Sequence, residues 1–404
     1  MENCFLRRAY AEIHLDRARR NIEKIKSLLP EKTKLMAVVK ANAYGHDDET
    51  MSKLFSSMGI ENFAVSNIHE AEKLRSYGIK GDILILGYTS PEYSEELSRF
   101  DIINTAVSYD HAKALSENAK STVRIHIKLD TGMGRIGLKN DSPIKTADEI
   151  EKICSLKNIK VEGMFTHFAV ADSDDEDDIS YTNSQRDFIL SVSDELKNRG
   201  IEIPAVHFLN SAGGTYYPDE RSAFARFGVM LYGLMPNFKK PLPFELEPVM
   251  ELKAEVSYVK EIKAGEYLSY GRTFKAPHDM KIATVTIGYA DGYSRLLSNK
   301  AEAIVNGKRA KVAGRVCMDQ LMLDVTGIDV KAGDIATMFG KDGSEKITAD
   351  ELADIYGTIG YEIICGISMR VPRVIIDNGE IVNVIEYRHS VYIISKKKKK
   401  RVPY

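Results

Sequence analysis

The sequence predicts an α/β protein in which an N-terminal (β/α)8 TIM-type barrel is followed by a mostly-β C-terminal domain. Up to about residue 233, short apolar runs alternate with longer amphipathic runs, as expected for parallel strands each followed by a helix. After that point prolines interrupt the stretch PNFKKPLPFELEP, and strand-like runs between glycine turns replace the helical periodicity. The predicted parts are an α/β barrel (1–240), a mostly-β domain (241–390) and a basic tail (391–404).

Eight runs rich in β-branched and other apolar residues predict the barrel strands. They are residues 35–39, 63–66, 83–86, 103–107, 123–129, 161–168, 206–210 and 226–232. Amphipathic segments, several beginning at a Ser, Asn or Asp cap, predict helices at 16–29, 48–58, 67–77, 109–120, 142–156 and 182–198. An open doubly wound sheet is the alternative architecture, but eight strands alternating with helices favour the barrel.

The C-terminal domain is predicted from shorter strand-like runs separated by glycine turns. These runs are residues 252–259, 282–287, 303–305, 311–316, 321–325 and 382–386. One helical segment, 348–357, interrupts them and precedes the stretch GTIGYEI.

Composition excludes several classes of partner and site. The 404 residues carry a formal net charge of -2, so neither nucleic acid nor an acidic membrane surface is expected as a partner. The cysteines, Cys4, Cys154, Cys317 and Cys365, are far apart in sequence, which argues against a zinc site or a disulfide framework. We expect no metal site. The N-terminus lacks the apolar core of a signal peptide, and we expect a cytoplasmic protein.

Two runs of charge stand apart from the motifs. The acidic run DSDDEDD, residues 172–178, is interpreted as a solvated loop, because consecutive carboxylates repel and metal-binding loops space their ligands around a glycine turn. The basic run KKKKKR, residues 396–401, is interpreted as a solvated tail, and we assign it no function.

A lysine ends the first predicted barrel strand, in the stretch AVVKANAYGHD. Functional groups of such barrels gather where strands end, and Lys40 follows the buried run directly. A lysine that loses contact with water has a lowered pKa and becomes an amine nucleophile towards carbonyl compounds, including the aldehyde of pyridoxal phosphate. The ordinary alternative is a surface lysine whose head group reaches water.

The later strands end in polar residues that a plain barrel core does not need. Lys128 and Arg135 lie in IKLDTGMGRIG, His167 in FTHF, and Arg226 in ARFGVM. Each alone is explained by a salt bridge or a satisfied core histidine, but their shared position at one face of the barrel favours a site. An anion cradle is predicted from Asn210 and Ser211 in LNSAGG with the backbone N–H groups of Gly228 and Val229.

A series of motifs, in this order and spacing, resembles bacterial alanine racemases over residues 9–373. They are VVKANAYGH, DTGMGRIG, THFA, NSAG, ARFGVMLYG, SYGRTF, GYADGY and RVCMDQ. The resemblance implies a pyridoxal-phosphate-dependent amino acid racemase of fold-type III. It also implies a head-to-tail homodimer and an activity that supplies D-alanine for peptidoglycan.

The resemblance assigns most of the candidate residues to the cofactor. Lys40 matches the lysine that binds it covalently, Arg135 the residue that holds its phenolic oxygen and the substrate carboxylate, and Lys128 a position often carbamylated to orient that arginine. Arg226 matches the residue at the pyridine nitrogen, where arginine donates a hydrogen bond without giving up its proton. The remaining cofactor contacts are Tyr44, Leu86, His167, Asn210, Ser211, Gly228, Val229 and Tyr361.

Racemisation requires a base on each side of the substrate α-carbon, and the resemblance supplies both. Lys40 is one base, and Tyr270 in SYGRTF is the other, delivered by the partner subunit with His167 and Arg226 as the relay behind it. Tyr289, Met318 and Asp319 match residues around the substrate.

Three alternatives remain open at this point. A serine or broad-specificity racemase shares nearly all of these motifs, although a tyrosine at Tyr361 favours alanine. A fold-type III amino acid decarboxylase keeps the cofactor, but SYGRTF and VCMDQ argue against it. A non-enzymatic pyridoxal-phosphate carrier has no β domain, whereas this chain is predicted to have one.

Overall fold

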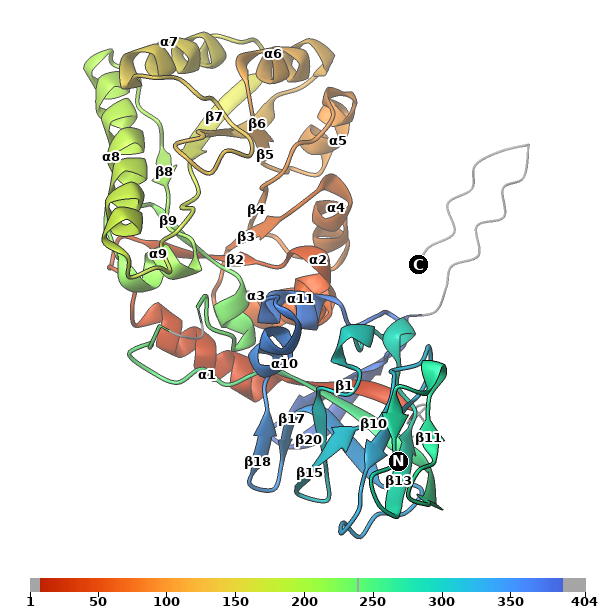
Figure 1. The fold of residues 1–404 in the computed structure, drawn as a ribbon. Coiled ribbons are helices and arrows are strands. Elements are labelled where there is room, and N and C mark those ends of the chain that lie inside the picture. The colour runs from red at the N-terminus through yellow and green to blue at the C-terminus, as the bar shows by residue number, and fades with distance from the viewer. Residues whose placement is uncertain (1–7, 238–239, 388–404) are drawn as a thin grey trace, which may run out of the picture. The chain divides into compact units, whose positions relative to one another are not determined.

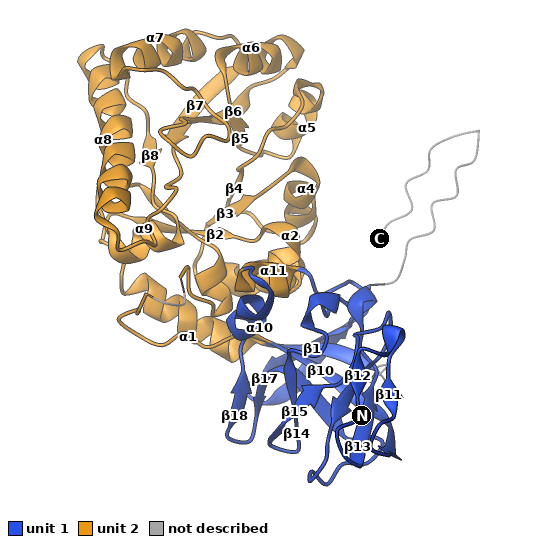
Figure 2. Ribbon diagram, viewed as in Figure 1, with its two compact units in different colours: residues 1–13, 251–358, 366–404 blue, residues 14–250, 359–365 orange. Residues whose placement is uncertain are grey.

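The computed structural model describes residues 8–237 and 240–387 and divides the chain into two compact units, which Figure 2 colours separately. Unit 1 comprises residues 1–13, 251–358 and 366–404, and unit 2 comprises residues 14–250 and 359–365. The predicted basic tail lies outside the described residues.

Unit 2 is built on parallel strands whose residues are mostly apolar and buried. The strands are β2 (Lys34–Val38), β3 (Asn62–Val65), β4 (Asp82–Ile85), β5 (Asn104–Ala106), β6 (Val123–Lys128), β7 (Ile159–Phe165), β8 (Ala205–His207) and β9 (Phe224–Phe227). They pair as two four-stranded sheets, β4-β3-β2-β9 and β5-β6-β7-β8. Such continuous apolar runs are typical of strands covered on both faces.

Two parallel bridges close these sheets into one ring. Leu84 pairs with Ile103 between β4 and β5, and Leu209 pairs with Ala225 between β8 and β9. The predicted eight-stranded barrel is therefore confirmed, and the open doubly wound alternative is wrong.

Helices follow the barrel strands and lie outside the ring, as Figure 1 shows for α4 to α8. The helical elements of unit 2 are α1 (Leu15–Lys26), α2 (Lys40–Tyr44), α3 (Asp48–Ser57), α4 (Ile68–Ser76), η1 (Pro91–Tyr93), α5 (Ser94–Arg99), α6 (Tyr109–Asn118), α7 (Pro143–Cys154), α8 (Glu176–Asn198), α9 (Ser211–Tyr216), η2 (Val229–Tyr232) and α11 (Gly360–Cys365). The side chains of Asn67, Ser108 and Ser142 cap α4, α6 and α7 by accepting hydrogen bonds from backbone N–H groups, as their residue types predict.

The acidic run is not wholly a loop, so that interpretation was wrong in part. Helix α8 begins at Glu176, six residues before the predicted start at Thr182. Asp175 is the N-cap, and its carboxylate accepts hydrogen bonds from the backbone N–H groups of Asp177 and Asp178. Negative side chains in the first turn are stabilised by the partial positive charge at a helix N-terminus, which compensates for their mutual repulsion.

Unit 1 is mostly antiparallel β-structure. Its strands are β1 (Ala9–His14), β10 (Met250–Ile262), β11 (Tyr267–Leu268), β12 (Phe274–Lys275), β13 (Met280–Val285), β14 (Glu302–Val305), β15 (Lys308–Val312), β16 (Leu321–Asp324), β17 (Ile335–Asp342), β18 (Glu345–Ile347), β19 (Arg373–Asp377) and β20 (Glu380–Ile385). Its other elements are η3 (Tyr270–Arg272), η4 (Tyr289–Asp291), η5 (Arg295–Leu297) and α10 (Ala349–Tyr356).

A closed barrel forms the centre of unit 1. The pairing order β17-β14-β15-β16-β13-β10 returns to β17, because β10 also pairs with β17. Strands β1, β19 and β20 extend the sheet beyond β10. The mostly-β domain is confirmed, although β1, β17 and β19 were not predicted. Alternating buried residues, such as Leu252, Ala254 and Val256 on β10, point into the barrel core.

Within residues 8–237 and 240–387, no helix is both long enough and apolar enough to cross a membrane.

Candidate active site

The strand ends of the unit 2 barrel carry the polar residues that the sequence singled out. Lys40 follows β2, Lys128 is the last residue of β6, His167 follows β7, and Arg226 lies on β9. Burial lowers the pKa of the His167 imidazole, and the positive charges of Arg226, Arg135, Lys128 and Lys40 lower it further. These cations therefore share one electrostatic neighbourhood, and His167 is neutral within it.

The Lys40 amine is in a medium that disfavours its charge. Burial lowers the pKa of Lys40, and the nearby positive charge of Arg135 acts in the same direction. A larger fraction of the amine is therefore unprotonated near neutral pH than in a solvated lysine. The unprotonated form is the one that attacks a carbonyl carbon or accepts a proton.

The backbone after Lys40 follows a left-handed path. Ala41, Asn42, Ala43 and Tyr44 have φ values of 53°, 55°, 51° and 54°. For residues with a Cβ atom, this conformation costs roughly 1–2 kcal/mol each, so four in succession must be compensated by the surroundings.

Hydrogen bonds from neighbouring elements hold this left-handed turn. Ala41 N donates to Glu70 Oε1 at 2.9 Å, and Asn42 Oδ1 accepts from Asp48 N at 2.9 Å. His46 Nδ1 lies 3.0 Å from the Tyr44 carbonyl oxygen, so this nitrogen carries the proton and donates. The turn places Tyr44 inside the protein, with 8% of its surface exposed.

Tyr44, Ser211 and Gly228 lie together where the sequence predicts a cradle for an anion. A Cβ atom on Gly228 would lie 2.4 Å from the Tyr44 hydroxyl oxygen, so the phenol packs against bare backbone. Gly228 N donates to Ser211 Oγ at 3.2 Å, which leaves the serine hydroxyl proton free to point elsewhere. Burial raises the pKa of Tyr44, so its hydroxyl stays a hydrogen-bond donor. The Tyr44 and Ser211 hydroxyls are hydrogen-bond donors of the kind that fit a phosphate group.

The other predicted cofactor contacts lie around this cradle or at neighbouring strand ends. The Tyr361 ring, on α11, lies 6.3 Å from the Tyr44 ring, centroid to centroid. Asn210 caps α9 by accepting from Gly213 N at 2.7 Å, so it shapes the turn that presents Ser211. Val229 directly follows Gly228 and is buried, and Leu86 follows β4 and is half-buried.

Arg226 donates to a histidine that sequence reasoning did not select. Its Nη1 lies 2.8 Å from His207 Nδ1, and its Nη2 lies 2.7 Å from the Thr166 carbonyl oxygen, next to His167 in the chain. His207 Nε2 in turn lies 2.9 Å from His126 Nδ1. An arginine only donates, so His207 accepts at Nδ1 and donates from Nε2, and His126 accepts at Nδ1.

Burial sets the protonation states of Arg226, His207 and His126. Burial lowers the pKa of His126 to about 3, and burial together with the Arg226 charge lowers that of His207. Burial also lowers the pKa of Arg226 to about 9, which leaves it protonated at neutral pH. Two neutral imidazoles thus support one buried guanidinium. In the sequence both histidines look like ordinary strand residues, and only their location on β6 and β8 could have drawn attention to them.

Lys128 and Arg135 belong to the strand end and loop after β6. Lys128 is 2% exposed, and its ammonium donates a hydrogen bond to the Leu129 carbonyl oxygen, with 2.6 Å between the two atoms. Burial lowers the pKa of Lys128 to about 7, with the Arg226 charge as the next cause. Lys128 is therefore partly unprotonated at neutral pH.

The remaining predicted residues belong to unit 1 and lie on turns. Tyr270 begins η3 and is 68% exposed, and Tyr289 begins η4 and is 41% exposed. Met318 is 53% exposed, and the neighbouring Asp319 carboxylate accepts a hydrogen bond from Arg370 at 2.9 Å. The loop around Met318 also contacts the loop of Tyr270, because Ser269 Oγ donates to the Arg315 carbonyl at 2.7 Å.

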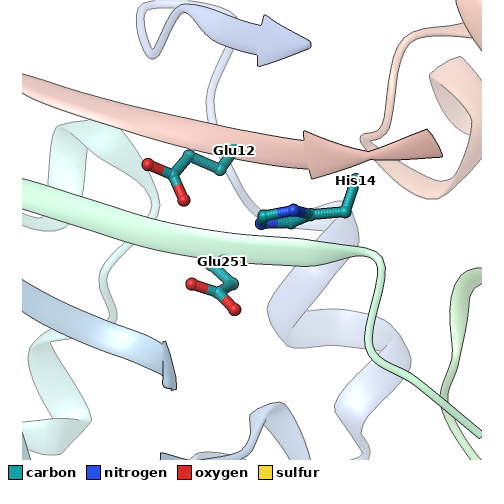
Figure 3. Close-up of side chains that lie close together, drawn as sticks. All are labelled: Glu12, His14 and Glu251. Carbon is teal, nitrogen blue, oxygen red and sulfur yellow. The ribbon is translucent and has the colours of Figure 1, made fainter. Parts of the chain in front are cut away.

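Figure 3 draws a group of side chains of the types that bind metal ions: Glu12, His14 and Glu251. The two carboxylates, both in unit 1, lie 2.6 Å and 3.3 Å from the Lys253 ammonium. One lysine therefore already balances much of their charge, and the group gives no argument for a bound cation. The absence of a metal site stays a prediction.

Two family descriptions match the sequence. "Alanine racemase, N-terminal domain" matches residues 13–236, and "Alanine racemase, C-terminal domain" matches residues 249–375. An alanine racemase of Clostridium perfringens is 43% identical over 393 residues, which cover 96% of this chain and 100% of that protein. One from Methanococcus maripaludis is 42% identical over 371 residues, 90% of this chain and 98% of that protein.

Solved structures agree with these matches. The alanine racemase of Bacillus anthracis with bound L-Ala-P superposes with a TM-score of 0.89 at 36% identity, covering 95% of this chain and 98% of that one. A histidine racemase from Leuconostoc mesenteroides superposes with a TM-score of 0.83 at 30% identity, covering 93% and 100%. The barrel, the β domain and the full-length similarity together show that this chain belongs to the alanine racemase family.

Proposed function

We propose that this protein interconverts L- and D-alanine as a pyridoxal-phosphate-dependent racemase. The observation that carries the proposal is the convergence, in one barrel, of a desolvated Lys40 amine and a cradle of Tyr44, Ser211 and Gly228 that fits a phosphate. A full-length relative at 43% identity that is an alanine racemase supports the same reaction.

The residues of unit 2 would hold the cofactor at both ends. Lys40 would bind its aldehyde carbon, and Tyr44, Ser211, Gly228, Val229 and Tyr361 would surround its phosphate. Arg226 would donate to the pyridine nitrogen, since its guanidinium is buried and has a proton that it does not give up. When bound, pyridoxal phosphate supplies an electron-withdrawing ring that stabilises negative charge at the substrate α-carbon.

Two side chains would move the proton. Lys40 Nζ would accept or return it on one side of the α-carbon, and the partner subunit's Tyr270 would do so on the other. The exposed position of Tyr270 on a turn of unit 1 suits a group that acts on a second copy of the chain, and supports a homodimeric enzyme. His167 would remain neutral and accept a hydrogen bond in the relay behind this tyrosine.

Lys128 is proposed to react with carbon dioxide. Its unprotonated, neutral Nζ would form a bond to the carbon of CO2 as one C–O π bond breaks, and one N–H proton would be released, which converts a neutral amine into a carbamate anion. The lowered pKa of Lys128, about 7, supports this reaction near neutral pH. The resulting carboxylate would orient the Arg135 guanidinium towards the substrate carboxylate.

Alanine is proposed as the preferred substrate because Tyr361 fills space beside the cradle. A smaller residue there would leave room for the hydroxymethyl group of serine. A histidine racemase with the same fold at 30% identity supports a second candidate, a racemase of larger amino acids.

Chiral chromatography of the purified protein with pyridoxal phosphate, incubated separately with L-alanine, L-serine and L-histidine, tests the proposal. We expect D-alanine to form faster than D-serine or D-histidine. Faster conversion of serine or histidine would replace the proposed substrate, and no D-amino acid from any of them would contradict the proposed reaction.

A further inference from the structure

Two turns of unit 1 are fixed to each other by their backbones. Tyr289 N donates to the Cys317 carbonyl and Ala290 N donates to the Met318 carbonyl, both at 3.0 Å. A Cβ atom on Gly288 would lie 2.3 Å from the Cys317 carbonyl oxygen, so this close approach requires glycine. Tyr289 and the loop of Met318 and Asp319 therefore hold one relative position as long as both turns stay in place.

A buried carboxylate lies behind these turns. Asp291 is 0% exposed, and its two oxygens accept from Arg8 Nη1 at 2.6 Å and Arg8 Nη2 at 2.8 Å. The backbone N–H of Gly288 donates to the same carboxylate at 3.0 Å, and Arg370 Nε lies 3.6 Å from it. Burying a carboxylate is costly unless it is paired and hydrogen-bonded, and here both conditions are met.

Arg8 and Arg370 also donate hydrogen bonds to the loop of Met318 and Asp319, which is predicted to lie around the substrate. Arg8 Nη2 donates to the Asp319 carbonyl at 3.0 Å, and Arg370 Nη2 donates to the Asp319 carboxylate at 2.9 Å. The Arg370 and Asp319 side chains are 41% and 51% exposed, whereas the Asp291 side chain is fully buried. The network is thus anchored at its buried end and touches the loop at its exposed end.

The exposure of the Arg370–Asp319 pair indicates that it positions the loop more than it stabilises the fold. Ion pairs between exposed side chains contribute little to the free energy of folding, because water and salt screen them. The Arg370–Asp319 bond therefore adds little to the stability of unit 1. Its main physical effect is to limit where the Met318–Asp319 loop can lie.

We propose that Arg8, Asp291 and Arg370 form a clamp that positions the loop of Met318 and Asp319 for the substrate, with Asp291 as its buried anchor. The inference rests on the proposed function, since it takes Met318 and Asp319 to lie around the bound amino acid. These three are positioning residues, because they act on the substrate through the loop.

The main test is Arg370→Gln, which removes the charged bond to Asp319 but leaves Asp291 paired with Arg8. Asp291→Asn removes the anchor, and Glu351→Gln is the matched control because it weakens another arginine–carboxylate contact of unit 1, the 2.6 Å pair of Arg309 and Glu351. Two readouts are measured on each pyridoxal-phosphate-loaded variant: amide hydrogen exchange of peptides covering residues 315–320, and KM and kcat for alanine.

For Arg370→Gln we expect exchange in residues 315–320 to become about twofold to fivefold faster, the effect of losing one exposed ion pair. KM should rise by a similar factor while kcat stays within about twofold, because a looser loop weakens binding more than chemistry. Asp291→Asn should exceed both effects, and Glu351→Gln should show neither.

Unchanged exchange in residues 315–320 for both variants would overturn the clamp. Faster exchange with unchanged KM would also overturn it, because the network would then be structural only. The exchange readout needs no turnover, so a wild-type protein that does not racemise alanine contradicts the proposed function without being mistaken for a failure of the clamp.

Discussion

The two units present their candidate functional groups in opposite ways. In the unit 2 barrel, Lys128 and Arg226 are 2% and 3% exposed, and burial shifts the pKa values of the lysines, the histidines and Arg226. In unit 1, Tyr270 and Met318 lie on turns and are more than half exposed. The barrel thus creates reactivity by removing water, whereas unit 1 holds exposed side chains in place with hydrogen bonds. The two halves should respond differently to substitution.

Removing the Lys40 amine should give the largest effect. Lys40→Ala would remove the proposed covalent attachment point and the proposed proton acceptor, so racemisation of alanine should fall by roughly 10³-fold or more. Chiral analysis of the product measures it. Lys34→Ala is the matched control, because Lys34 is the exposed first residue of the same strand. Equal activity of Lys40→Ala and Lys34→Ala would show that the half-buried Lys40 amine has no special role.

The second-largest effect is expected from a substitution that fills the cradle and so weakens cofactor binding. In Gly228→Ala the new methyl group would lie 2.4 Å from the Tyr44 hydroxyl and must displace it. The dissociation constant of pyridoxal phosphate, measured by fluorescence titration of cofactor-free protein, should rise about tenfold or more. Gly59→Ala is the control, since its φ of +79° brings strain but no atom lies within 4 Å of the added Cβ. An unchanged dissociation constant in Gly228→Ala would remove the cradle from the account.

The buried histidines should make folding of the barrel sensitive to acid. The pKa of His126 is about 3 in the folded protein against an ordinary value of 6.5, so between these pH values only the unfolded chain binds this proton. The contribution of His126 to the free energy of unfolding is therefore fully present above pH 6.5. It is lost as pH falls towards 3, by about 1.4 kcal/mol per pH unit.

Urea unfolding of His126→Gln and wild type at about pH 7 and about pH 5 isolates this contribution. The variant should lose less stability on acidification than wild type, because glutamine still accepts from His207 but does not titrate. His69→Gln, which changes an exposed histidine, should behave like wild type. The same loss of stability in His126→Gln as in wild type would contradict a neutral buried His126.

The smallest expected effect concerns substrate choice. Tyr361→Ala should raise kcat/KM for serine relative to alanine by about fivefold, because a hydroxymethyl group gains space but no new hydrogen-bond partner. Tyr361→Phe keeps the ring and should leave the ratio near that of wild type. A ratio that moves equally in both variants would assign the effect to the hydroxyl and not to the size of the ring.

The parallel strands of the barrel were predictable, but their ends were not. Residues 226–232 read as one apolar run, whereas the strand stops at Phe227 and the rest forms the buried turn η2. Buried turns and buried strands are equally apolar, so periodicity does not separate them. Strand β17 escaped prediction because Gly340 and charged residues follow its short apolar part.

The sequence predicted that the charged groups of the candidate site lie at strand ends, but not the backbone conformation and hydrogen bonds that support them. Nothing in the letters ANAY indicates four left-handed residues, since no glycine precedes Gly45 and the compensating bonds come from Glu70 and Asp48. His126 and His207 also went unnoticed, because their role depends on a pairing between strands that only the fold supplies. Long-range partners of this kind have no local sequence signal.

The central claim is that the barrel shelters the Lys40 amine so that it, and no other lysine, binds the cofactor. Borohydride reduction of the protein loaded with pyridoxal phosphate, followed by peptide mass mapping, tests it most directly. We predict a pyridoxyl group on the peptide that contains Lys40, at about one per chain. A label on Lys128 or on surface lysines, with Lys40 unmodified, would contradict the account.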